Sequence, residues 1–157
     1  MMGLSRSVIG GVAGGVVGAA AMLPIFEGAR RLGLIRESPP ARVIDHAAAT
    51  AGQATEIGRP VDQDERTVTS IGSHMLYGTA AGAIYGLLQD ELKLPADPGG
   101  MAYGIALWTA GYIGLLPALG VLPRPWQQRT GDALVPFAAH LVYGIALGRV
   151  DAAVRQA

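Results

Sequence analysis

Four long uncharged stretches limit what this chain can fold into. They cover Val8–Phe26, Val68–Leu88, Gly100–Leu122 and Ala133–Gly148, and none contains Asp, Glu, Lys or Arg. A bilayer core of about 30 Å needs roughly 20 helical residues, because each helical residue advances about 1.5 Å. Backbone polar groups cannot stay unpaired in lipid, so each stretch is expected to be a helix. The sequence therefore predicts an all-α membrane bundle of four transmembrane helices. It would form a single domain, residues 1–157, with an extramembrane loop at residues 28–67.

Composition agrees with this class and excludes several others. Half of the residues are hydrophobic, only 15% are charged, and glycine occurs 23 times, which suits closely packed membrane helices. The formal net charge is zero, so the chain lacks the excess of basic residues that is typical of nucleic-acid-binding proteins. The absence of cysteine excludes disulfides, thiolate metal sites and cysteine nucleophiles. A basic start and the small-residue run Ala19–Ala21 leave a cleaved signal peptide as an alternative for the first stretch.

One motif, H-x-x-Y-G-x-A-x-G, occurs in both the second and the fourth stretch. It runs from His74 to Gly82 and again from His140 to Gly148. Helix positions four apart share a face, so each copy places a histidine at the head of a glycine stripe. The stripe residues are His74, Gly78, Gly82 and Gly86 in the first copy, and His140, Gly144 and Gly148 in the second. Tyr77 and Tyr143 are the other polar intramembrane candidates.

The first stretch carries its own small-residue pattern. Gly10, Gly14 and Gly18 follow each other at four-residue spacing, which lets two membrane helices approach closely. This pattern predicts a helix-packing stripe of the glycine-zipper type. The pairs Leu23-Pro24 and Leu116-Pro117 occupy equivalent places near the ends of the first and third stretches. Together with the duplicated motif, they predict an internal repeat of two αα-hairpins, with the second and fourth helices parallel.

The segment between the first two stretches is polar. Ser38 followed by Pro39 and Pro40 is typical of a helix start and predicts a short helix over Ala41–Ala51. His46 beside Asp45 in this helix is expected to be solvated. No catalytic spacing occurs in this segment.

Four hypotheses account for the two histidines. Polar groups within spans face the protein interior, so each imidazole can hydrogen-bond across a helix interface and lock the bundle. Alternatively, His74 and His140 can ligate one haem b, with the neighbouring glycines admitting the macrocycle. A third hypothesis is proton or ion handling, with Tyr77 or Tyr143 extending a relay. A metal site that adds His46 is the fourth.

No motif for catalysis is present. Ser73 lies beside His74 on the helix and cannot face it, and no P-loop, H-E-x-x-H, G-x-S-x-G or dinucleotide fingerprint occurs. The chain is therefore expected not to be an enzyme. The sequence favours a structural or accessory membrane protein whose partners are the lipid bilayer and, as alternatives, a second copy or another membrane protein. A haem- or small-ligand-binding protein and a small transporter or channel are the other hypotheses.

Two segments also resemble a known family. The run from Trp108 to Gly120, followed by Ala139-His140-Leu141-Val142-Tyr143-Gly144, resembles the small bacterial inner-membrane proteins grouped as YagU-like. This resemblance implies four spans and a location in the bacterial inner membrane. It implies no biochemical activity, because none is established for that group.

Overall fold

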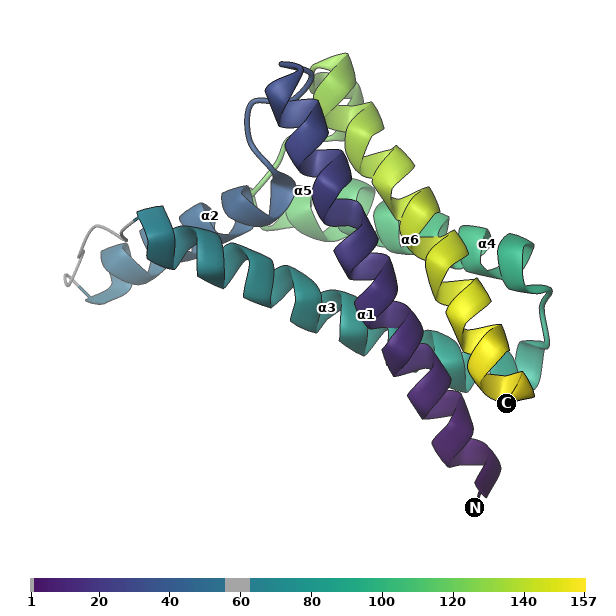
Figure 1. Cartoon of the computed structure of the whole chain (residues 1–157). Helices are drawn as coiled ribbons and strands as arrows, with labels where there is room; N and C mark the ends of the chain where they lie inside the picture. Colours follow the sequence, from purple (N-terminus) through teal and green to yellow (C-terminus); the bar gives the residue numbers. More distant parts are fainter. Residues whose placement is uncertain (1, 56–62) are drawn as a thin grey trace.

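The computed structural model describes residues 2–55 and 63–157, and its regular elements in those ranges are all helices (Figure 1). The elements are α1 (Met2–Arg31), α2 (Pro39–Thr55), α3 (Gln63–Leu92), α4 (Ala96–Trp108), the π-helix η1 (Thr109–Leu115), α5 (Leu116–Ala118), the 3₁₀ turn η2 (Pro125–Gln127) and α6 (Thr130–Gln156). The predicted all-α class is confirmed. Part of the predicted extramembrane loop, residues 56–62, lies outside the described ranges.

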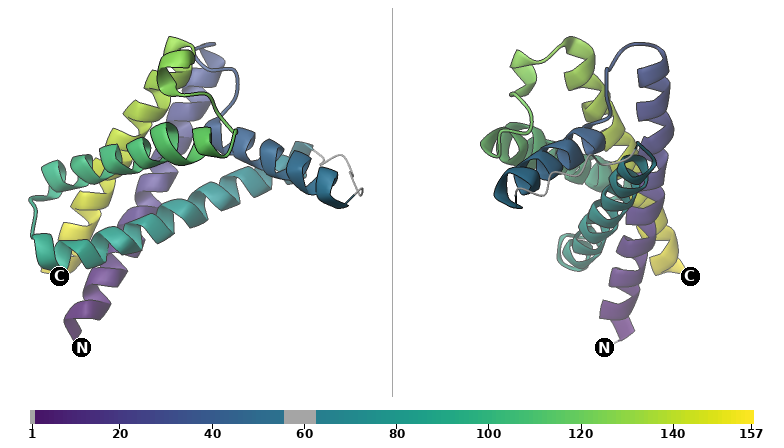
Figure 2. Two further views of the ribbon diagram at one scale, coloured as in Figure 1. Left: turned by 180° about the vertical axis from the view of Figure 1, so that it is seen from behind. Right: turned by 90° about the vertical axis from the view of Figure 1, so that its left-hand side faces the viewer.

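Helix α1 is the centre of the assembly. It packs against α3 on one side and α6 on the other, and α4 packs on α6 (Figures 1 and 2). In Figure 1, α1 and α6 run side by side, whereas α3 crosses α1 and α4 crosses α6 obliquely. The buried core lies where α1 meets α6 and includes Ala19, Met22, Phe26, Tyr143 and Leu147.

The first helix is longer than the sequence predicts. It continues through Pro24 to Arg31 rather than ending at Phe26. It ends where Gly33 adopts a φ of 69°, and the Leu34 N–H donates back to the Ala29 carbonyl at 2.9 Å. This is a Schellman-type cap, in which glycine takes the left-handed conformation that other residues avoid. Gly120, with a φ of 71°, ends the α5 segment in the same way.

Ion pairs fix the end of the molecule where both termini lie. Arg155 near the end of α6 lies 2.6 Å from Asp90 near the end of α3, and Arg149 of α6 lies 2.8 Å from Asp97 at the start of α4. Ser7 at the start of α1 also bonds Asp90. Helices α1 and α4 therefore begin at this end, while α3 and α6 finish there.

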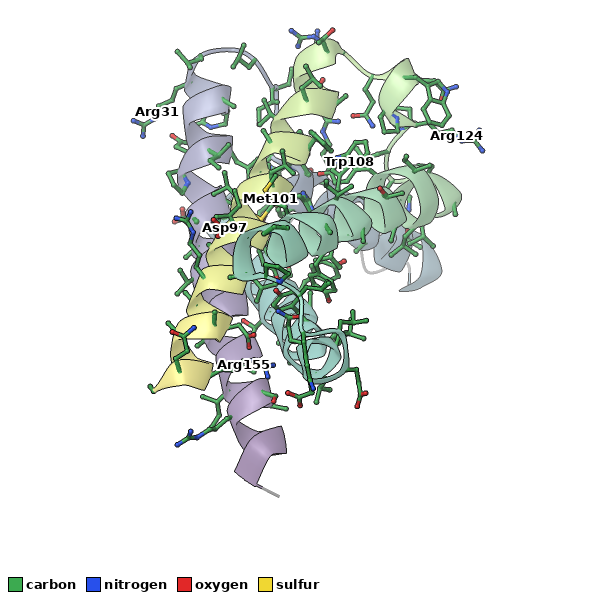
Figure 3. The ribbon with its side chains drawn as sticks, turned by 90° about the vertical axis from the view of Figure 1, so that its right-hand side faces the viewer. Arg31, Asp97, Met101, Trp108, Arg124 and Arg155 are labelled. Carbon is green, nitrogen blue, oxygen red and sulfur yellow. The ribbon has the colours of Figure 1, made fainter. Side chains whose placement is uncertain are left out.

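The opposite end is held by the α2 segment. Arg66 of α3 pairs with Glu37 and Asp45, and Arg42 of α2 lies 3.4 Å from Asp132 at the start of α6. Figure 3 shows Arg31 and Arg124 toward this end and Arg155 toward the other. The four long segments α1, α3, α4–α5 and α6 consequently alternate in direction. The predicted helix over Ala41–Ala51 is confirmed inside the longer α2.

Three helical segments of the described chain are long and apolar enough to cross a membrane. They are Arg6–Arg31, Ala96–Ala118 and Thr130–Gln156. They contain the first, third and fourth predicted stretches, except for the last four residues of the third stretch, Leu119–Leu122. The second stretch, Val68–Leu88, is helical within α3 but less apolar, because His74, Tyr77 and Tyr85 interrupt its hydrophobic residues. The protein is thus an all-helical chain with three helices that could span a membrane.

The third stretch is not one continuous α-helix. It changes from α to π geometry at Thr109, returns to α at Leu116 and stops at Ala118. Pro117 gives a physical reason, because a proline ring clashes with the carbonyl four residues earlier in an α-helix. Local π geometry is one way that membrane helices accommodate proline. The expected single helix to Leu122 was therefore wrong in its last four residues.

Candidate functional site

The first copy of the motif forms a close helix crossing. The glycines Gly78, Gly82 and Gly86 of α3 lie against α1, opposite Gly11 and Gly15. A Cβ added to Gly82 would come within 2.5 Å of the Gly15 Cα and would also overlap the Gly11 carbonyl oxygen. These contacts are with backbone, which cannot rotate away. Glycine at these positions allows the two helix backbones to touch directly.

The second copy forms a similar crossing with a different partner. Gly144 and Gly148 of α6 lie against α4, where they meet Gly100 and Ala96. A Cβ on Gly104 would overlap the His140 carbonyl oxygen. Sequence reasoning did not assign a packing role to Gly100 and Gly104, although their four-residue spacing was the available signal.

The stripe in α1 packs on the other side of that helix. Gly10, Gly14 and Gly18 lie opposite Asp151, Leu147 and Tyr143 of α6 respectively. A Cβ on Gly18 would lie 2.7 Å from the Tyr143 ring. Helix α1 therefore uses two adjacent glycine rows, one for α3 and one for α6. Both grooves beside the motif histidines are occupied by a neighbouring helix.

His74 bonds across a helix interface. Its Nε2 lies 3.2 Å from the Ala19 carbonyl oxygen of α1, and its ring meets the Phe26 ring edge-on at a centroid distance of 6.1 Å. A carbonyl oxygen can only accept a hydrogen bond, so Nε2 carries the proton. In the neutral ring, Nδ1 of His74 is therefore an acceptor.

His140 bonds within its own helix. Its Nδ1 lies 2.7 Å from the Pro136 carbonyl oxygen, and its ring meets the Tyr112 ring edge-on at 5.9 Å. The same reasoning places the proton on Nδ1 and leaves Nε2 of the neutral ring as an acceptor. The hypothesis of a hydrogen bond across a helix interface therefore describes His74, whereas His140 bonds within α6.

The two motif tyrosines have different surroundings. Tyr143 is buried and donates its hydroxyl hydrogen to the Gly78 carbonyl of the first motif copy at 2.7 Å. Tyr77 is 55% exposed on the outer face of α3. A further tyrosine, Tyr103 of α4, donates to the Ala81 carbonyl at 2.7 Å. Tyr143 and Tyr103 therefore connect helices α6 and α4 to α3.

One cavity brings the two motif copies together. It has a volume of about 300 Å³, and its lining includes His74, Tyr77, Gly111, Tyr112, His140 and Tyr143. The π-helix forms one wall, which agrees with the tendency of π-helical turns to occur at functional sites. No Asp, Glu, Lys or Arg belongs to the lining in the described parts of the chain. This is a neutral, mainly apolar chamber with two imidazoles.

A second cavity opens beside the first. It has a volume of about 590 Å³, and its lining includes the charged residues Glu27, Arg30, Arg36, Glu37 and Arg66. The two cavities share Phe26, Pro40 and His74. His74 thus lies between a charged space near the chain's polar loop and the apolar chamber.

The nitrogens Nδ1 of His74 and Nε2 of His140 make no hydrogen bond within the described chain. Histidines that bind metal or ligand commonly hold a carbonyl with one nitrogen and present the other. His46 lines neither cavity, and the described residues contain no group of three potential metal ligands. The proposed three-histidine metal site is therefore not formed.

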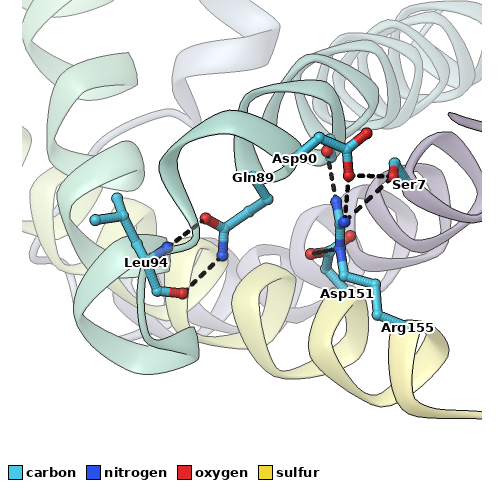
Figure 4. Close-up of polar contacts among 7 residues, drawn as sticks. Ser7, Gln89, Asp90, Leu94, Asp151 and Arg155 are labelled. Carbon is cyan, nitrogen blue, oxygen red and sulfur yellow. Dashed lines mark hydrogen bonds and ion pairs between the residues drawn. The ribbon is translucent and has the colours of Figure 1, made fainter. Parts of the chain in front are cut away.

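A polar cluster between three helices was not expected from the sequence (Figure 4). Arg155 donates to Asp151 at 2.7 Å, to Asp90 at 2.6 Å, to Ser7 at 3.2 Å and to the Gly86 carbonyl at 2.5 Å. The Ser7 hydroxyl also donates to the Asp90 carboxylate, so Asp90 accepts from both α1 and α6. Asp151 is 1% exposed, and its Oδ1 has no hydrogen-bond partner in the described chain.

Comparison with known proteins gives a family and no activity. No curated protein and no solved structure matches the chain. A protein-family model does match the chain, over residues 14–148. This range includes both motif copies, with His74 and His140. On this match the chain belongs to the family described as protein of unknown function DUF1440.

Proposed function

We propose that this chain is an accessory, non-catalytic membrane protein that binds a small ligand between its helices. The observation that carries the proposal is the shared cavity, into which both copies of the motif contribute a histidine with an unbonded nitrogen. Small-ligand sites are typically apolar chambers of about 300–1,000 Å³ with a few placed polar groups. The cavity of about 300 Å³ lies at the lower limit of that range.

We place α3 in the membrane as a fourth span. Both termini lie at one end of the molecule, and the four long segments alternate in direction, which supports an even number of crossings. Glycine contacts between α3 and α1 put this helix at the same depth as a candidate span. The two motif-bearing helices α3 and α6 then belong to two repeated hairpins. A bacterial inner membrane is the location that the family resemblance supports.

Haem b is the cofactor alternative, and the geometry supports it less. Haem ligation needs space for a macrocycle beside each histidine, whereas backbone from α1 and α4 fills the glycine grooves. The Nε2 of His74 is also committed to the Ala19 carbonyl. An absorption spectrum of the detergent-purified protein, expressed with haem supplied, is expected to lack a Soret band.

A purely structural role is the other alternative, and a pair of glycine substitutions separates it from ligand binding. Gly111 lines the cavity, and a Cβ added there meets nothing within 4 Å. Gly111→Leu is therefore expected to fill the cavity without straining the helices. Gly114→Leu is the matched control, because Gly114 lies in the same π-helix, has equally open surroundings and does not line the cavity.

The measurement is native mass spectrometry of protein purified in mild detergent from its native membrane. The parent and Gly114→Leu are expected to carry the same small molecule, and Gly111→Leu is expected to lose it while unfolding at a similar temperature. A parent that carries no small molecule, or a Gly111→Leu variant that keeps it, contradicts the proposal. Either outcome favours the purely structural role.

A further inference from the structure

We propose that the ligand of this cavity is a neutral, lipid-soluble aromatic diol of the hydroquinone class. The inference rests on the proposed function and adds the chemical class of the ligand. It follows from four properties of the cavity: the two histidines that line it, each with a nitrogen that can only accept a hydrogen bond, its lack of charge, its aromatic walls and its exposed lining residues.

The two imidazoles can together accept two hydrogen bonds from a ligand. Because Nε2–H of His74 and Nδ1–H of His140 are held by carbonyl oxygens, the other nitrogen of each neutral ring can only accept. The carbonyl partners belong to helix backbone, so they fix these tautomers. A ligand with hydroxyl groups at two positions satisfies both acceptors. A ligand with acceptors alone, such as a quinone, satisfies neither.

The lack of charge selects a neutral ligand. The lining in the described chain contains no ionised side chain, and burying an unpaired charge in an apolar space is costly. A carboxylate, phosphate or amine therefore fits poorly. A phenolic hydroxyl stays neutral and donates readily.

The walls favour a flat ring. Phe26, Tyr112 and Tyr143 all line the cavity, and aromatic rings pack best on other rings in stacked or edge-on arrangements. The imidazoles already show this preference, since His74 meets Phe26 and His140 meets Tyr112 edge-on. At about 300 Å³ the chamber holds a single substituted ring rather than a large ring system.

The cavity opens to the outer face of the helices. Tyr77 of α3 and Leu115 of η1 both line it, yet they are 55% and 56% exposed. Leu115 belongs to a candidate span and Tyr77 to α3, so this exposed part of the lining lies on helices with long apolar stretches. A lipid-soluble ligand can enter there, and an attached apolar chain can remain outside.

The test compares four probes that share one ring and one tert-butyl group. They are tert-butylhydroquinone with two hydroxyl donors, its monomethyl ether with one, and its dimethyl ether and tert-butyl-1,4-benzoquinone with none. Affinities are measured by isothermal titration calorimetry on the full chain in lipid nanodiscs under argon. Each hydroxyl donor is expected to lower the Kd roughly fivefold, which is the change in affinity that a typical net hydrogen bond produces. The quinone is expected to bind as weakly as the dimethyl ether.

A histidine variant tests whether Nε2 of His140 accepts a hydrogen bond from one of the ligand hydroxyls. His140→Phe keeps an aromatic ring and removes Nε2, so the advantage of the diol over its monomethyl ether is expected to disappear. Gly114→Leu is expected to bind all four probes as the parent does. Equal affinity for the diol and its dimethyl ether, preference for the quinone, or no binding of any probe overturns the hydroquinone class.

The outcomes separate this inference from the function on which it rests. If none of the probes binds while Gly111→Leu still loses the co-purified molecule, the cavity is a ligand site for another chemical class. If the co-purified molecule is absent or unaffected by Gly111→Leu, the ligand-binding function itself fails. A diol that binds the parent with the expected donor dependence and does not bind Gly111→Leu supports both.

Discussion

At the scale of single residues, glycines of one helix have opposite roles. Gly82 of α3 meets the backbone of α1 directly, whereas a Cβ added to Gly72 of the same helix meets nothing within 4 Å. The first glycine is required by packing, and the second only weakens the helix, since glycine is less favourable there than alanine. Chemically identical residues therefore respond differently to the same substitution.

Replacing each of these glycines by alanine is expected to change stability in opposite directions. Gly82→Ala forces the α1–α3 crossing apart, and overpacking of this kind costs about 1–3 kcal/mol. Gly72→Ala gains helix propensity of up to about 1 kcal/mol. Thermal unfolding of the purified variants in detergent checks both signs. If Gly82→Ala unfolds at or above the temperature of the parent, α1 and α3 do not cross through this glycine.

Sequence spacing identified residue types but not their neighbours. The motif predicted one glycine stripe below each histidine, and both stripes do lie at helix crossings. It could not tell that α1 packs on the first copy and α4 on the second. Nor could it separate Tyr143 from Tyr77, because burial of one and exposure of the other depends on which helix lies beside each. The cavity could not be predicted from the sequence for the same reason, because its walls come from several helices.

At the scale of elements, proline shows why the fold was only partly predictable. Pro24 and Pro136 lie inside continuous α-helices, whereas Pro117 follows a π-helix. All three lie in similar glycine- and alanine-rich surroundings. The backbone response to each proline depends on neighbouring helices, so composition predicted a helix in each case and missed the interruption that forms a cavity wall.

None of the described side chains of α2 belongs to the buried core, and ion pairs join this helix to α3 and α6. Arg66 of α3 bonds both Asp45 of α2 and Glu37 just before it. The hydrogen bond from Arg66 holds the pKa of Asp45 below its ordinary value of 3.8. A carboxyl whose folded pKa is lowered stabilises the folded state above its unfolded pKa, and this stabilisation disappears as the pH falls through the folded value.

Acidification is therefore expected to release α2 while the membrane helices remain packed. Hydrogen exchange of the α2 amides should accelerate as the pH falls below about 3.8, after correction for the intrinsic pH dependence of exchange. Arg66→Gln should show fast α2 exchange already at neutral pH and lose this pH dependence. Unchanged protection of α2 in Arg66→Gln would show that the ion pairs do not hold it.

At the scale of the whole molecule, one arginine connects three helices that are far apart in sequence. Arg155 of α6 bonds Ser7 of α1 and Asp90 of α3 as well as Asp151 one turn before it. Asp151 is 1% exposed, so Arg155 is the charge that compensates a buried carboxylate. The second arginine of this helix, Arg149, is 66% exposed and pairs with Asp97, whose side chain is 46% exposed.

The two arginines are expected to differ sharply in their importance. Arg155→Ala leaves the Asp151 carboxylate buried without its partner, which typically costs roughly 3–5 kcal/mol. Arg149→Ala removes an exposed, screened pair and is expected to leave the unfolding temperature nearly unchanged. Adding Asp151→Asn to Arg155→Ala removes the stranded charge and should recover much of the lost stability. Thermal unfolding of the parent, these three variants and Asp151→Asn alone measures these differences. Recovery in the double variant identifies charge compensation as the role of Arg155, whereas losses that simply add would show that Arg155 and Asp151 act independently.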